Sequence, residues 1–257
     1  MKKALLVIGA LLLLGVGAGA AMFLPVMMGM APMVDGTKLA GGSATLVADG
    51  YVAIFMLDGD AGQVALIDCG NDPSGSAILT ALKARSLGPE AVKAIFLTHG
   101  HPDHVAGCHL FPAAEIYAFA ADVKIASGEE RAKGPLPSKF DLPKEKAAKV
   151  TKTLTDGESI SVGGLQVKAY AVPGHTAGSA AFLSKGVLYL GDNAAGRSSG
   201  KGIKPAPWVF SDDTALNAAE LKKLHARLKV ERAEVKTLAF AHTGPLDGLE
   251  LLGTADQ

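Results

Sequence analysis

Three histidines and one aspartate lie within six residues, in the stretch Thr98-His99-Gly100-His101-Pro102-Asp103-His104. In an extended chain His99, His101 and Asp103 would alternate and point the same way. Asp103 and His104 are adjacent, so the chain must turn there if both are to face one site. A cluster of imidazoles without a metal gains little stabilising energy, and the rings repel one another when they are protonated. Imidazole and carboxylate ligands together favour zinc, with iron and manganese as alternatives. The stretch therefore predicts a metal site.

Three more polar residues, His175, Asp192 and His242, each follow a predicted strand. Each alone is a weak signal, because histidine after Pro-Gly is commonly a loop residue and aspartate after glycine commonly caps a turn. Together with the first stretch they give five histidines and two aspartates at strand ends, which suffices for two metal ions that share a carboxylate. We expect the remaining histidines of the predicted helices, His109 and His225, to be solvated or packing residues.

Short apolar segments position these groups. In the first half the predicted strands are 43–47, 51–57, 64–68, 94–97 and 115–119, and Asp-Gly turns separate the first three. A helix is predicted from Asp72 or Ser74 to Arg85, and the chain after the histidine stretch can be helical as far as Leu110. In the second half they are 150–153, 160–162, 166–172, 180–184, 187–190 and 235–240, with one helix. We expect Ser211 to cap that helix, and Leu216, Leu221, Leu224 and Leu228 to share its apolar face. The shared plan of the two halves predicts two β-layers packed face to face with helices outside.

The segment from Gly128 to Lys149 breaks this pattern, because three prolines alternate with basic residues. It is too long for a simple connection. It is either a lid or a solvated tether, and we slightly favour the tether.

The N-terminus carries Lys2 and Lys3 and then no charged residue before Asp35. This is typical of a signal peptide, with Ala18-Gly19-Ala20 as a cleavage site, or of an uncleaved anchor over residues 4–24. Both alternatives predict export of the rest of the chain, to the periplasm or the medium. We therefore divide the chain into a leader, 1–34, and one domain, 35–257.

The composition points to a small-molecule substrate. Basic and acidic residues balance at 25 each, so nothing indicates binding to nucleic acid, and membrane association would come from the N-terminal segment. Two cysteines, Cys69 and Cys108, are too few for a disulfide framework. The two could form one disulfide in an oxidising compartment, but we favour small buried thiols.

Four motifs resemble, in their order along the chain, those of the metallo-β-lactamase-fold metallohydrolases, in particular the glyoxalase II and lactonase branch. They are Thr98–His104, Pro173-Gly174-His175-Thr176-Ala177-Gly178-Ser179, Leu190-Gly191-Asp192 and Ala241-His242-Thr243-Gly244. The resemblance implies an α/β fold, a four-layer αβ/βα sandwich, holding two divalent metal ions. By this resemblance His99, His101 and His175 bind the first ion, Asp103, His104 and His242 the second, and Asp192 bridges them. Asp68 matches an aspartate that supports the ligands.

The resemblance also implies a mechanism, in which the metals lower the pKa of a bridging water towards ~7 and Asp103 orients the resulting hydroxide. We expect hydrolysis of an ester, lactone or thioester. Cysteine stands in place of Asp192 in the best-known β-lactamases, which makes β-lactams a weaker expectation, as are phosphodiesters. Only residues 243–257 follow the last ligand, so we do not favour glutathione thioesters. The alternative function is an iron-dependent oxidoreductase of the persulfide dioxygenase type.

Overall fold

The computed structural model describes residues 29–139, 141–143 and 147–255. One sheet contains β1 (Lys38–Leu39), β2 (Ala44–Asp49), β3 (Val52–Asp58), β4 (Val64–Ile67), β5 (Val92–Phe96), β6 (Glu115–Phe119) and β7 (Lys152–Leu154), in that order. The other contains β8 (Ser159–Val162), β9 (Leu165–Ala171), β10 (Ala180–Ser184), β11 (Val187–Tyr189), β14 (Thr237–Ala239) and β15 (Leu246–Asp247), in the order β15-β14-β11-β10-β9-β8. A separate hairpin joins β12 (Ala194–Gly196) to β13 (Ile203–Pro205).

Both sheets are mixed. The strands from β1 to β4 pair antiparallel, as the Asp-Gly turns predicted for β2 to β4, and those from β4 to β7 pair parallel. In the second sheet β11 and β14 are parallel, and the remaining pairs are antiparallel.

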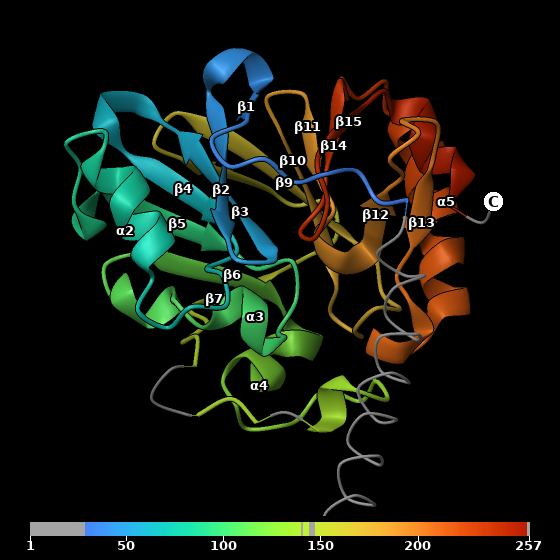
Figure 1. Cartoon of the computed structure of the whole chain (residues 1–257), viewed down its shortest axis with the longest axis horizontal. Helices are drawn as coiled ribbons and strands as arrows, with labels where there is room; N and C mark the ends of the chain where they lie inside the picture. The colour runs from blue at the N-terminus through green and yellow to red at the C-terminus, as the bar shows by residue number, and fades with distance from the viewer. Residues whose placement is uncertain (1–28, 140, 144–146, 256–257) are drawn as a thin grey trace, which may run out of the picture.

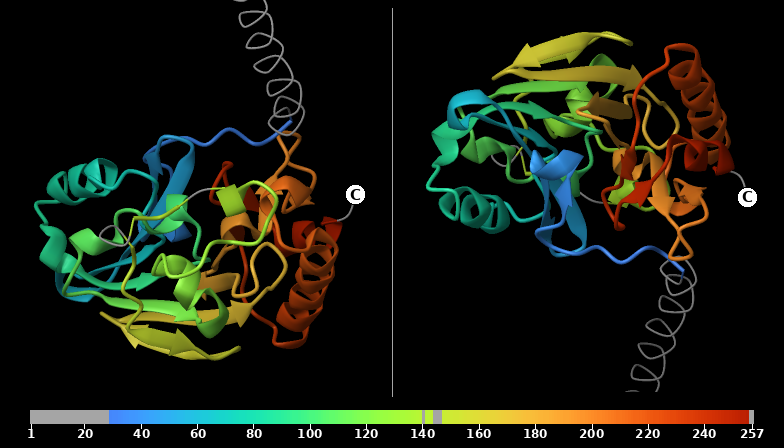
Figure 2. Two further views of the ribbon diagram at one scale, coloured as in Figure 1. Left: turned by 90° about the horizontal axis from the view of Figure 1, so that it is seen from below. Right: turned by 90° about the horizontal axis from the view of Figure 1, so that it is seen from above.

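The helices α2 (Ser76–Lys83) and α5 (Thr214–Val230) lie on opposite outer faces of the sheet pair (Figures 1 and 2). Two short helices, α3 (Pro102–Val105) and α4 (Val123–Ala126), lie on the side of the first sheet. Alternate side chains of β3 serve both faces, since Phe55 enters the core between the sheets while Ile54 and Met56 pack under the helices. The predicted four-layer αβ/βα sandwich is confirmed.

Two details of α5 correct the sequence prediction. The cap is Asp213, whose Oδ1 accepts a hydrogen bond from the backbone N–H of Leu216 at 2.9 Å. Ser211 lies further upstream, and its hydroxyl lies 3.2 Å from Nδ1 of His175. Leu221, Leu224 and Leu228 are buried as expected, but Leu216 is exposed, because five residues of an α-helix place it about 140° away from Leu221 around the axis.

Cys69 and Cys108 form a disulfide, with Cα atoms 5.3 Å apart, so the preference for free thiols was wrong. Cys69 follows the end of β4, and Cys108 follows α3. The backbone N–H of Cys69 donates to the carbonyl of His104 at 2.7 Å. This contact between residues distant in sequence brings the two sulfur atoms together, and local patterns do not reveal it.

We expect the double variant Cys69→Ser/Cys108→Ser to lose about 3–4 kcal/mol of unfolding free energy, because the bridge spans a sequence separation of 39 residues. Urea denaturation of the oxidised wild type, the reduced wild type and the variant measures this loss. The reduced wild type is the matched control and should unfold with the variant. Equal midpoints for all three proteins would contradict the prediction.

The segment 128–149 is docked where the structure describes it, so the solvated-tether interpretation was wrong for that part; residues 140 and 144–146 lie outside the described ranges. The N–H of Leu136 donates to the carbonyl of Val209 at 3.0 Å, and that of Ala148 to the carbonyl of Ala126 at 2.9 Å. The small or apolar residues that alternate with the charges, such as Ala132 and Pro137, are buried. Burial of these residues holds the segment against the protein.

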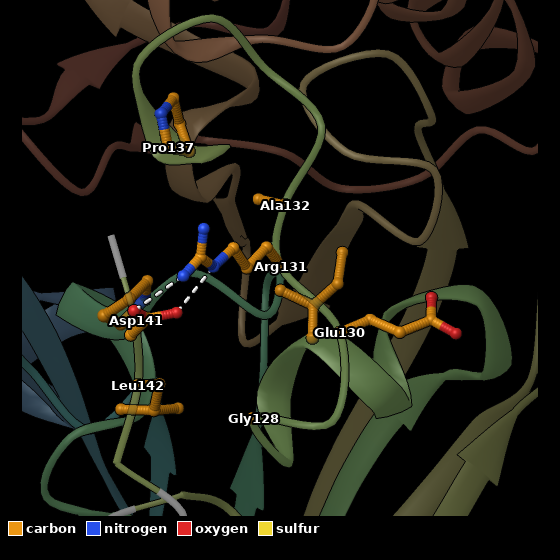
Figure 3. Close-up of a pocket in the computed structure, with 9 residues that line it drawn as sticks. Gly128, Glu130, Arg131, Ala132, Pro137, Asp141 and Leu142 are labelled. Carbon is orange, nitrogen blue, oxygen red and sulfur yellow. Dashed lines mark hydrogen bonds and ion pairs between the residues drawn. The ribbon is translucent and has the colours of Figure 1, made fainter. Parts of the chain in front are cut away.

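A small pocket lies between this segment and the helices α3 and α4 (Figure 3). Pro102 and Ile125 contribute to it from the helices. Arg131 points across it to Asp141, and the guanidinium donates to both carboxylate oxygens at 2.6 and 2.8 Å. The pair is well exposed, so it contributes little to stability.

The predicted leader falls mostly on residues 1–28, which lie outside the described residues. The part that is described packs on the domain, since Ala31 donates its N–H to Gly196 at 2.8 Å and accepts from Gly244 at 3.0 Å. Within the described ranges, no helix has both the length and the apolar character needed to cross a membrane.

Candidate metal centre

The first cluster consists of His99, His101 and His175. The chain leaves β5 at Phe96, bends at Thr98, is extended at His101 and enters α3 at Pro102. His175 comes from the turn between β9 and β10. Its Nε2 lies 3.1 Å from Nε2 of His99 and 3.2 Å from Nδ1 of His101. All three side chains are buried. Three imidazole nitrogens this close could hold one cation.

The second cluster consists of Asp103, His104 and His242. The turn at Pro102 brings Asp103 and His104 to one side, as the alternation argument required. Nε2 of His242 lies 3.7 Å from Oδ2 of Asp103, and Nε2 of His104 lies 3.9 Å from the same oxygen. One nitrogen from each histidine and one carboxylate oxygen can therefore hold a second cation.

Asp192 lies between the two clusters. Its Oδ2 is 3.1 Å from Nε2 of His242 and 3.6 Å from Nε2 of His175, and its Oδ1 is 3.4 Å from Nε2 of His104. The preceding glycine makes this position possible, because a Cβ on Gly191 would collide with the side chain of Thr98. The structure thus brings all seven predicted ligand residues together.

Hydrogen bonds orient four of the imidazole rings. Each bond uses Nδ1 and leaves Nε2 facing the clusters. Nδ1 of His104 contacts Asp68 at 2.8 Å, and Nδ1 of His242 contacts the carbonyl of Tyr51 at 2.8 Å. Nδ1 of His99 contacts the Thr98 hydroxyl at 3.1 Å, and Nδ1 of His175 contacts the Ser211 hydroxyl at 3.2 Å. Both hydroxyls donate elsewhere, to Asp68 and to the carbonyl of Pro207, so they accept from the rings. Such partners select the tautomer that binds a metal.

Burial keeps the imidazole rings of the first cluster in the neutral form. Burial is the main cause that holds the pKa of His99 and of His175 well below the usual range, and neighbouring histidines lower it further. Burial likewise lowers the pKa of His101 to about 4. These rings are neutral at physiological pH, which is the form that binds a cation.

Neighbouring carboxylates raise the pKa of both histidines of the second cluster. Burial by itself lowers the pKa of His104, but the carboxylates of Asp192, Asp103 and Asp68 outweigh it and hold this pKa well above the usual range. For His242 burial is again outweighed, chiefly by Asp192, and the pKa rises to about 9. Burial raises the pKa of Asp192, but His242 and His104 outweigh it and hold this pKa well below its usual range.

We therefore expect the two clusters to bind metal with different pH dependence. A metal entering the second cluster must displace protons from His104 and His242, because the pKa of each is raised, so its affinity should increase as pH rises towards the His242 pKa of about 9. A metal entering the first cluster displaces none above about pH 5. Calorimetric titration with Zn²⁺ in buffers of different ionisation enthalpy counts the released protons. Equal proton release from both binding steps would contradict the prediction.

The buried polar atoms fit metal ions. Nε2 of His104 and Oδ1 of Asp192 are buried and have no hydrogen-bond partner among the described residues. A buried polar atom without a partner is costly, and the two atoms lie 3.4 Å apart between the clusters. Imidazole and carboxylate donors together suit zinc, iron or manganese.

Sequence reasoning missed three residues of the site. Asp122 accepts hydrogen bonds from Gly100, Thr176 and Gly178, Ser211 supports His175, and Tyr51 supports His242. None of them belongs to a metal-binding motif. The two histidines expected to lie elsewhere do so: His109 contacts the carbonyl of Ala106 at 2.9 Å, and His225 pairs with Glu250 at 3.3 Å.

A family model, that of the metallo-beta-lactamase superfamily, matches residues 47–242, which include both clusters. The chain belongs to this superfamily. Among curated proteins, the hydroxyacylglutathione hydrolase of Serratia proteamaculans is 33% identical over 139 residues, which are 54% of this chain and 45% of that protein. The match thus spans about half the length of this relative.

Solved structures share the fold. MEM-A1, a subclass B3 metallo-beta-lactamase from a soil metagenome library, is 22% identical with a TM-score of 0.61, covering 82% of this chain and 80% of that one. A metallo-beta-lactamase family protein from Thermus thermophilus is 21% identical with a TM-score of 0.58, covering 81% and 76%. At these identities the likeness establishes the metallo-β-lactamase fold alone. The chain is accordingly a superfamily hydrolase with a histidine-rich candidate metal site.

Proposed function

We propose that this superfamily member is an exported dinuclear metallohydrolase that cleaves an ester, lactone or thioester. The position of Asp192 carries the proposal, since one of its oxygens lies near both His175 of the first cluster and His242 of the second. A carboxylate in this position joins two cation sites into one centre. Two adjacent cations are the arrangement that clamps the attacking and leaving atoms of a hydrolysis.

Metal ions and protein side chains have separate roles in the proposed hydrolysis. Bound divalent ions supply Lewis acidity and make a coordinated water acidic near neutral pH. Asp103 is partly exposed and lies at the edge of the second cluster, so it can orient the attacking water and accept its proton. The same carboxyl can then return the proton to the leaving alkoxide or thiolate. Asp68 keeps His104 in the tautomer that the site needs.

The substrate class rests on chemistry and on one relative. The Serratia relative is named for hydrolysis of an acylated glutathione, which supports a thioester. Esters and lactones react through the same carbonyl chemistry.

The test is metal analysis of the purified protein, followed by assays with lactones, thioesters, β-lactams and phosphodiesters. We expect about two equivalents of zinc, iron or manganese and turnover of lactones or thioesters. Consumption of oxygen with a persulfide, by a protein with one iron, would instead identify an oxidoreductase. Hydrolysis of β-lactams or phosphodiesters alone would also overturn the proposal.

Export is the second part of the proposal. The disulfide between Cys69 and Cys108 supports it, because disulfides persist mainly in oxidising compartments. The charge-free run after Lys3 supports it as well. Cell fractionation with an antibody against the domain tests it, and uniform recovery from the cytosol with an intact N-terminus would refute it.

A further inference from the structure

Tyr51 places an exposed aromatic ring beside the metal centre. It stands at the tip of the β2–β3 hairpin, where Asp49 pairs with Val52, and 56% of the residue is exposed. One face of its ring stacks on His242, with centroids 5.7 Å apart and planes 19° from parallel. The exposed surface of Tyr51 therefore lies within reach of a molecule bound between Asp103, Asp192 and His242.

The hairpin tip is fixed from two sides. Towards the second sheet, the carbonyl of Tyr51 accepts from Nδ1 of His242 at 2.8 Å, and the N–H of Ala53 donates to the carbonyl of Ala241 at 2.6 Å. Towards the loop after β4, the Tyr51 hydroxyl donates to Oδ1 of Asn71 at 3.3 Å. The carboxylate of Asp49 also accepts the N–H of Asn71 at 2.7 Å. Backbone, hydroxyl and ring are thus all held, and the ring is presented in one orientation.

A fixed aromatic ring is a suitable binding surface for an apolar group. Tyrosine offers a large contact area and loses little conformational entropy, since it has only two side-chain torsions. A ring already held in place loses still less when a ligand binds.

We propose that Tyr51 is a specificity-determining residue, and that its exposed ring surface binds the apolar group attached to the scissile carbonyl. The preferred substrates are then esters or thioesters with an extended alkyl or aromatic acyl group. This inference rests on the proposed hydrolase function. Contact with about 55 Å² of apolar surface corresponds to about a tenfold preference over a substrate that lacks it.

The experiment measures kcat and KM for a thioester series from acetyl to octanoyl, using the metal-loaded full chain. Tyr51→Ala should lower the ratio of kcat/KM for the octanoyl thioester to kcat/KM for the acetyl thioester about tenfold, through a higher KM for the octanoyl substrate. Tyr51→Phe keeps the ring and should keep the preference for long chains. Leu216→Ala is the matched control, because it removes an exposed apolar side chain from α5 on the outer face.

Two outcomes would overturn the inference. One is an equal loss for all chain lengths in Tyr51→Ala, and the other is loss of metal from that variant; both would mean that the ring only supports His242. A binding measurement separates this inference from the proposed function. Even if no thioester were hydrolysed, octanoate should bind the metal-loaded wild type more tightly than acetate does, and Tyr51→Ala should reduce that ratio about tenfold. An unchanged ratio would refute the role of Tyr51.

Discussion

Replacing Asp192 with alanine is expected to lower the turnover of lactones or thioesters by about 100-fold or more, a typical loss when a metal site is disrupted. The carboxylate lies between the clusters, 3.1 Å from His242 and 3.4 Å from His104. Without it, two cations would face each other with less negative charge between them and with no shared ligand. We therefore expect weaker metal binding as well as slower turnover.

The measurement is steady-state kinetics with metal content determined on the same samples. Asp247→Ala is the matched control, since it removes an exposed carboxylate from β15 of the same sheet and should leave both quantities unchanged. Wild-type turnover by Asp192→Ala at full metal occupancy would show that Asp192 is not a ligand. Asp192→Cys should not gain efficient β-lactam hydrolysis, because one exchanged ligand does not reshape the surrounding loops.

The sequence predicted which residues come together at the candidate metal centre because each has a local signature. His99 and His101 alternate directly before Pro102, Asp103 and His104 follow that proline, and His175, Asp192 and His242 each follow a short apolar strand. Strand ends that meet at one edge of a sandwich bring such residues together. The same local logic predicted the hairpins around Asp49-Gly50 and Asp58-Gly59, and hence the start of the first sheet.

The residues that the sequence did not reveal act through contacts distant in the chain. The bridge between Cys69 and Cys108 depends on how β4 and α3 meet, which periodicity does not encode. Ser211 looked like a helix cap because serine is common there, yet its hydroxyl contacts His175, 36 residues away. The docking of the segment 128–149 was missed for a similar reason. Its prolines and lysines are typical of an exposed loop, and the small residues between them show no pattern that predicts burial.

Asp122 is the clearest of these cases. Its carboxylate accepts the N–H of Gly100 at 2.8 Å, the hydroxyl of Thr176 at 2.7 Å and the N–H of Gly178 at 2.7 Å. Gly100 lies between two ligands of the first cluster, and Thr176 follows the third. One buried side chain therefore joins the loop of His99 and His101 to the loop of His175. Gly178 allows this approach, because a Cβ there would lie 2.7 Å from the Asp122 carboxylate.

Replacing Asp122 with asparagine is expected to weaken metal binding at the first cluster by about 10- to 100-fold, while the second cluster changes much less. Asparagine keeps the size but presents a donor to one of the three donors, so one hydrogen bond is lost and the two loops lose their fixed spacing. Alanine would leave buried N–H groups without a partner, at about 1–3 kcal/mol each, so we also expect Asp122→Ala to unfold more readily.

Competition with a graded chelator, with metal counted per chain, measures the affinity of each site. Glutamine at the exposed Glu129 is the control for loss of a negative charge. Because Asp122 contacts the loops that carry His99, His101 and His175 and none that carries His242, equal weakening of both sites, or none, would show that it does not position the first cluster.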